Sequence, residues 1–318
     1  MEVAENLREI TEDAVDRYRD TYGDEPPTTW EDIQEIMEEG ETAEQQDIDE
    51  FLETQTQFYD QLLDADYGRL TEDLNERVRY QASRGQIARD MFNPMNAGFT
   101  LAGTPLTLGA TMLYGPPELA VPVTAAGTVY ANYKLSEITN EGAFMPGKDL
   151  IGVSNESKSK PDAYKVLASE LFHAYQYEEG SDTWHHPFLR EGLERASSVK
   201  ALEQEYPEKG EAFRTHVLLT GSFQADEMLD KEIVDELDLP QETREQLEKD
   251  ARKLKHSEYN LPAALIYAAE ETEGEEIYGE LFNNDYSSIE QELELLKGKG
   301  TKAQNIKSLF WKTVNKVA

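Results

Sequence analysis

Residues 161–194 read PDAYKVLASELFHAYQYEEGSDTWHHPFLREGLE, and this stretch decides the fold. Ser159 precedes it, and Pro161 stands where the first turn of a helix tolerates proline. Apolar residues then recur at helical spacing, at Val166, Leu167, Leu171, Ala174 and Tyr177. The stretch predicts a helix over residues 161–178, a turn-rich loop with two adjacent histidines, and a second helix over residues 190–204.

The first helix carries the sequence Ser169-Glu170-Leu171-Phe172-His173. Residues four apart project from one face of a helix, so a His-Glu-x-x-His sequence lets two imidazoles hold zinc beside a glutamate that takes a proton from the bound water. Here Ser169 stands in place of the first histidine. His173 remains a candidate metal ligand, and Glu170 a candidate catalytic base.

The second helix begins with FLREGL at residues 188–193, and 17 residues, 174–190, separate His173 from Glu191. This arrangement resembles the gluzincin metallopeptidases, in particular the branch that contains zinc aminopeptidases and their small archaeal relatives. In that family a glutamate at the start of the following helix is the third zinc ligand. The resemblance implies that Glu191 is a metal ligand.

Two further segments are similar to the same family. Residues 258–265, EYNLPAAL, resemble a helix that opens with a tyrosine supporting the tetrahedral transition state, which implies that role for Tyr259. Residues 142–154 resemble the sheet edge that lies over the cleft and pairs with an extended substrate. The resemblance covers roughly residues 118–295, most of one domain.

The fold class implied is α+β and mostly helical, with a zincin-like domain in which a small mixed sheet lies over an active-site helix and a helical C-terminal subdomain follows. We expect an acidic helical region over residues 1–95 and the zincin-like domain over residues 96–295. Within that domain we expect the sheet at about residues 119–154 and the last helices at residues 211–295.

The chain of 318 residues has 65 Asp and Glu against 30 Lys and Arg, a net charge of -35. This excess opposes binding to nucleic acid or anionic lipid and is screened at molar salt, which favours a protein of a high-salt environment. Hydrophobic residues at 38%, with 16 Tyr and 11 Phe, predict a packed fold rather than disorder. The absence of cysteine excludes disulfides and thiolate metal sites.

An apolar segment at residues 97–133 contains a single charge, Glu118. Its two halves, residues 98–114 and 119–133, are short for membrane spans, and Pro105 and Pro122 interrupt them. A buried hairpin of helices, or strands leading into the sheet, is the favoured interpretation, and a membrane hairpin is the alternative. The acidic start of the chain lacks the basic and apolar runs of a secretory signal, so a cytoplasmic location is expected.

The last segment, residues 296–318, contains six lysines and no acid, with apolar residues at helical spacing. We expect a basic amphipathic helix that docks on the acidic surface of the same molecule or on a second copy, giving a homo-oligomer.

Zinc is the cofactor that the resemblance implies, but a serine hydroxyl is a poor zinc ligand and catalytic zinc sites ordinarily keep three protein ligands. His185 or His186 in the loop could replace the lost imidazole. The site would then take a peptide or protein partner, with or without hydrolysing it.

Three hypotheses follow. The first is a gluzincin-fold pseudopeptidase that serves as a binding or structural module. The second is an active zinc-dependent peptidase with an altered ligand set. The third is a helical membrane-associated or assembly protein without catalytic activity, which a structure lacking a sheet over the Ser169 helix would favour.

The net charge generates a first prediction. The melting temperature should rise as KCl increases from dilute to molar concentration, because the screening length falls from about 10 Å at 0.1 M to about 3 Å at 1 M. Thermal unfolding followed by circular dichroism over this range tests the point, and a flat melting temperature would contradict the high-salt interpretation.

Overall fold

The computed structural model describes residues 2–23, 25–64, 77–82, 142–145, 150–154, 159–181, 183, 187–229, 234, 237–253 and 259–283. Over these residues the protein is mostly helical, as the sequence predicts, with one small sheet. The apolar segment at residues 97–133, both loop histidines and the basic segment at residues 296–318 lie outside the described residues.

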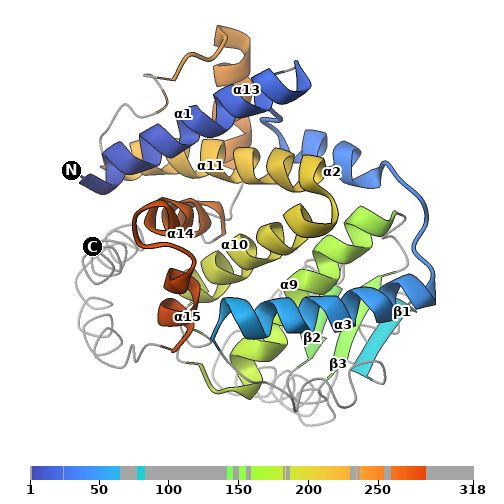
Figure 1. Cartoon of the computed structure of the whole chain (residues 1–318). Helices are drawn as coiled ribbons and strands as arrows, with labels where there is room; N and C mark the ends of the chain where they lie inside the picture. The colour runs from blue at the N-terminus through green and yellow to red at the C-terminus, as the bar shows by residue number, and fades with distance from the viewer. Residues whose placement is uncertain are drawn as a thin grey trace, which may run out of the picture.

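The described elements are α1 (Glu2–Tyr22), α2 (Trp30–Glu38), α3 (Gln45–Leu62), β1 (Val78–Ala82), β2 (Gly142–Met145), β3 (Leu150–Ser154), α9 (Lys160–Glu178), α10 (Pro187–Glu205), α11 (Pro207–Leu229), α13 (Gln241–Lys253), α14 (Asn260–Glu273) and α15 (Glu276–Asn283). Helix α10 occupies the middle of the molecule and contacts α9, α11 and α14 (Figure 1). Elements from both ends of the sequence therefore share one core.

Helix α9 begins where the sequence predicts. The Ser159 hydroxyl accepts a hydrogen bond from the Asp162 backbone N–H at 3.3 Å, and Pro161 lies in the first turn, where its missing N–H costs nothing. The helix then runs to Glu178, the predicted end. The second predicted helix, α10, extends beyond the expected residues 190–204 at both ends.

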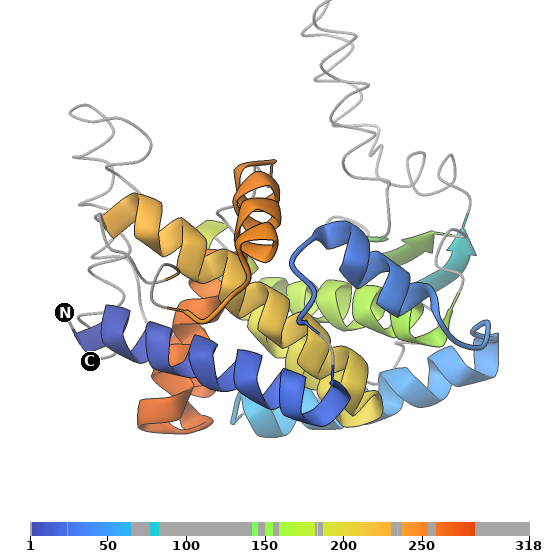
Figure 2. The same ribbon diagram turned by 90° about the horizontal axis from the view of Figure 1, so that it is seen from above.

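The sheet has the strand order β1-β3-β2, with β1 parallel and β2 antiparallel to β3. It packs against α9, beside which the strands lie in Figure 2. A Cβ added to Gly142 of β2 would lie 2.4 Å from Cγ1 of Val166, so the strand can approach the helix this closely only because residue 142 is glycine. Strands β2 and β3 fall within the expected sheet region, and residues 119–141 of that region are not described.

Strand β1 corrects the sequence analysis, which predicts only helices over residues 1–95. Val78 is buried, and the Tyr80 hydroxyl donates to the Ala43 carbonyl at 3.1 Å. These two residues alternate with polar ones at the period of a strand, but five residues are too few to stand out against the helical pattern that precedes them.

Helix α1 packs against α11 although the two helices are far apart in the sequence (Figure 2). The hydroxyls of Thr11 and Ser222 are fully buried and lie 2.9 Å apart, although the two residues are 211 positions apart in the sequence. At the surface, Arg17 forms an ion pair with Glu211 at 2.5 Å. The N-terminal helices are thus part of the main core.

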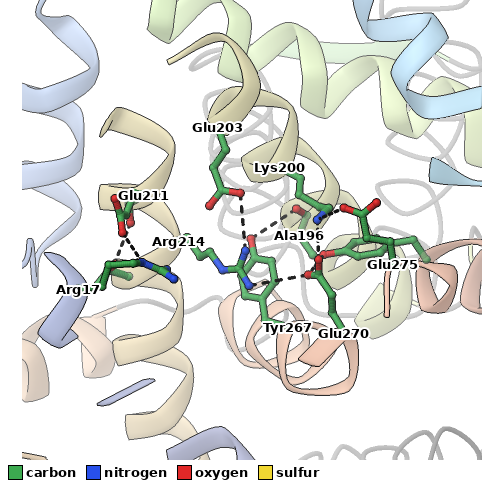
Figure 3. A network of polar contacts seen from close by, with 11 residues as sticks. Arg17, Ala196, Lys200, Glu203, Glu211, Arg214, Tyr267, Glu270 and Glu275 are labelled. Atoms are coloured by element: carbon green, nitrogen blue, oxygen red, sulfur yellow. Dashed lines mark hydrogen bonds and ion pairs between the residues drawn. The ribbon is translucent and has the colours of Figure 1, made fainter. Parts of the chain in front are cut away.

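A network of ion pairs lies between α10, α11 and α14 (Figure 3). The Glu270 carboxylate contacts Lys200 Nζ at 2.5 Å and Arg214 at 3.9 Å, and it accepts a hydrogen bond from the Tyr278 hydroxyl at 3.0 Å. Glu203 lies 3.7 Å from the same arginine. Glu270 of α14 therefore pairs with one cation of α10 and one cation of α11, and these contacts help to hold the three helices together.

Among the described helices, none is long and apolar enough to cross a membrane.

The network predicts that Glu270→Gln will destabilise the protein strongly. The Glu270 side chain is only 13% exposed, and its removal leaves the Lys200 ammonium, itself 12% exposed, without its closest partner. Breaking such a pair costs about 3 kcal/mol. Chemical denaturation in molar salt gives the free energy of unfolding.

Glu271→Gln is the matched control, because it removes the same charge from an exposed position on the same helix. Its effect should stay within about 0.5 kcal/mol. Equal effects of the two substitutions would show that the network contributes nothing to stability.

Candidate functional site

The candidate site lies between α9 and α10, which run in opposite directions. The Gln176 side-chain N–H of α9 donates to the Arg190 carbonyl at 3.2 Å, while His173 Nε2, one turn earlier, lies 3.6 Å from Glu191 Oε2. Residue numbers thus fall along α9 as they rise along α10. Glu191 points at His173, as the sequence analysis expects, and its side chain is only 8% exposed.

The His173 ring is held in one orientation by Gln176. The Gln176 amide donates to the Thr183 hydroxyl and to the Arg190 carbonyl, each at 3.2 Å, which directs its Oε1 to His173 Nδ1 at 3.0 Å. Because an amide oxygen only accepts, Nδ1 carries the proton of this hydrogen bond. Nε2 is therefore the nitrogen that faces the acidic residues of α10. Sequence reasoning missed Gln176, whose only signal is its position three residues after His173.

Electrostatics favour a charged pair at this point. Burial alone would lower the pKa of His173, but the hydrogen bond and charge of Glu191, followed by the charges of Glu194 and Glu170, raise it to about 9. For Glu191, burial opposes ionisation, but His173 and then Arg190 hold its pKa down to about 2. Arg190 also binds the Glu191 carboxylate directly, at 2.6 Å.

Glu170 lies on the sheet side of the same group. Its Oε2 accepts a hydrogen bond from the Phe144 backbone N–H of β2 at 2.5 Å. Burial is the main cause that raises the pKa of Glu170, to about 7. The charge of His173 opposes this rise, and the charge of Glu194 adds to it. The candidate base therefore titrates near neutrality while tied to the strand.

Glu194 is a member of the site that sequence reasoning missed. It follows Glu191 by three residues and so shares its helical face, and it is only 1% exposed. One ligand atom from each of His173, Glu191 and Glu194 lies within 4.8 Å of the others. An imidazole and two carboxylates are donors that zinc accepts, so these three residues could hold a metal ion.

Tyr259 lies at the start of α14, beside the acidic residues of α10. Burial raises its pKa above the ordinary value, and the charges of Glu191 and Glu194 raise it further. The approach depends on Gly192, where an added Cβ would lie 2.4 Å from Cβ of Pro262. The predicted tyrosine thus lies in the neighbourhood of the predicted ligand.

The other predicted positions have different outcomes. Ser169 lies half-buried in α9, one turn before His173. It is not one of the three residues that could hold a metal ion. His185 and His186 are outside the described residues, so their proposed substitution for the missing ligand stays a prediction.

Comparison of the chain with protein-family models, with curated proteins and with solved structures finds no match.

The paired His173 and Glu191 predict a pH effect that Glu191→Gln will remove. Since the pKa of folded His173 is raised above the ordinary 6.5, its contribution to stability is fully present below pH 6.5 and is lost as pH rises through about 9. In Glu191→Gln the pKa of His173 should fall markedly. Histidine NMR titration of both proteins measures it.

Glu179→Gln is the control, because it removes the same charge from an exposed residue that directly follows α9. It should leave the titration of His173 unchanged. A His173 that titrates at its ordinary pKa in the parent protein would contradict the pairing.

Proposed function

We propose that this chain is a gluzincin-type metallopeptidase-like protein with a degenerate zinc site, and that it serves as a binding module for an extended peptide. The observation that carries the proposal is the pairing of His173 with Glu191 at 3.6 Å under a β-strand, with Ser169 one turn before the histidine. A peptidase of this type would need a second imidazole at residue 169.

The proposed peptide site is strand β2. Among the described strands, β2 pairs on one side only, with β3, so its other edge could accept an added strand. The Phe144 N–H is the donor that Glu170 occupies. An arriving peptide carbonyl would compete with Glu170 for this donor, which makes the carboxylate part of the binding surface.

The state of the two key acids supports binding rather than hydrolysis. A general base must be free to take a proton from water, whereas the Glu170 carboxylate is bonded to the strand. A ligand glutamate must present its oxygens to a metal, whereas Glu191 is held by Arg190 and His173. The sheet on α9 also supports this function over that of a purely helical assembly protein.

A second candidate function is a zinc-dependent peptidase that uses His173, Glu191 and Glu194 as ligands. The grouping of these three residues within 4.8 Å favours it. Ligand atoms around a tetrahedral zinc ion lie about 3.4 Å apart, so the side chains would have to close in, and Arg190 would have to release Glu191. Zinc bound there would polarise a water molecule. Glu170 would take the proton after releasing the Phe144 N–H, and Tyr259 lies near the same carboxylates.

Restoring the missing imidazole tests the proposal. A histidine at residue 169 shares one helical face with His173, and Glu191 completes a His-His-Glu ligand set. Ser169→His should therefore raise zinc affinity by more than about 100-fold, beyond the effect of a residue that only supports a ligand. Calorimetric zinc titration measures this, and hydrolysis of an unfolded peptide such as casein gives a second readout.

Glu179→His is the control, because it adds an imidazole at the exposed residue that follows the end of the same helix. Glu194→Gln in the parent protein separates the two functions. A binding module loses no activity, whereas the peptidase loses both zinc affinity and hydrolysis. If Ser169→His folds and binds zinc no better than the parent, the site is not a degenerate zinc site.

A further inference from the structure

Arg195 follows Glu194 in α10, yet no described carboxylate or carbonyl binds its guanidinium, and its Nε is buried without a hydrogen-bond partner among the described residues. Arg19 also has a buried Nε without a hydrogen-bond partner among the described residues, but its terminal nitrogens contact carboxylates. Arg17, Arg190 and Arg214 contact carboxylates, and Arg244 donates to backbone carbonyls. An arginine without such a partner is unexpected in a chain with 65 acidic residues and calls for a physical explanation.

Three aromatic rings hold the guanidinium in place. Its Cζ lies 5.1 Å from the ring centroid of Phe213, 5.4 Å from that of Tyr259 and 5.7 Å from that of Trp30. Ring faces attract the cation without consuming its N–H donors. The side chain is therefore positioned while no described residue accepts a hydrogen bond from it.

Arg195 is one helical turn beyond Glu191, the residue that pairs with His173. Because α9 runs in the opposite direction, the position on that helix that matches Arg195 is Ser169, one turn before His173, and Lys165 lies one further turn before Ser169. Lys165 Nζ lies 5.1 Å from the Trp30 ring that also contacts Arg195. Two cations thus meet at Trp30 beside the candidate site, and Lys165 is additionally paired with Asp162 at 3.2 Å.

We propose that Arg195, positioned by Trp30, Phe213 and Tyr259, binds a carboxylate of the peptide that occupies the adjacent site. This inference rests on the proposed function and adds the group that is recognised. Guanidinium N–H groups bind a carboxylate through two parallel hydrogen bonds, and the positive charge of Lys165 adds to the attraction. The carboxylate is either the C-terminal group of the peptide or an acidic side chain.

Three labelled hexapeptides of alternating alanine and threonine distinguish these sources. One has a free C-terminus, one has a C-terminal amide, and one has the amide and a central glutamate. Fluorescence anisotropy measures their affinity for the full chain in about 2 M KCl, where nonspecific repulsion is screened. We expect at least one carboxylate peptide to bind about tenfold more tightly than the neutral peptide.

Arg195→Gln should reduce that preference to about onefold, and Arg195→Lys, which keeps the charge but not the planar pair of donors, should retain part of it. Arg17→Gln is the control, because it removes the same charge from a residue of α1 outside the site. Circular dichroism establishes whether each variant folds. If Arg195→Gln does not fold, Arg195→Lys alone tests the proposal.

The outcomes separate the two proposals. If all three peptides bind the parent protein equally, Arg195 does not recognise a carboxylate, but the peptide-binding function stands. A preference that survives in a folded Arg195 variant likewise overturns the inference. If no peptide binds, the proposed function fails, and the role of Arg195 fails with it.

Discussion

Gly192 of α10 lies so close to Pro262 of α14 that no side chain fits between them. This contact lets α10 pack against α14 while another face of α10 meets α9. One face of α10 presents Glu191 and Glu194 to His173, and another contributes Lys200 to the ion-pair network with Glu270. A displacement of α10 would disturb the candidate site and the network together, because one rigid helix carries both.

The use of charge inside this protein follows from its composition. With a net charge of -35, most carboxylates repel one another at the surface, and there are too few Lys and Arg side chains to pair with all of them. Lys200 and Arg214 are used in the interior, where weak screening makes each contact stronger. The same scarcity makes Arg195 informative, since its guanidinium is held by aromatic rings instead.

Sequence reasoning works here where a local rule decides the outcome, and fails where a tertiary contact does. Ser159 and Pro161 locate the start of α9 because capping involves only neighbouring residues. The approach of Glu191 to His173 is expected from the resemblance of residues 169–173 and 188–193 to a known family, and the distance of 3.6 Å agrees with that expectation. The roles of Gln176, Glu194 and Arg190 depend on which atoms of the two helices face each other. Strand β1 depends on pairing with β3, which begins 72 residues further on in the sequence. No local pattern reports such contacts.

The buried contact between Thr11 and Ser222 has a consequence for folding. Helix α1 is synthesised before α11, which follows only after about 200 further residues have been added, because Thr11 and Ser222 are 211 positions apart. Until then the apolar face that carries Leu7 and Ala14 has no native surface to cover it. Docking of α1 closes a loop of about two thirds of the 318-residue chain, so it belongs among the late steps of folding. The excess of acidic residues on the exposed face of α1 keeps the waiting helix apart from other nascent chains in dilute salt, a protection that weakens as salt rises.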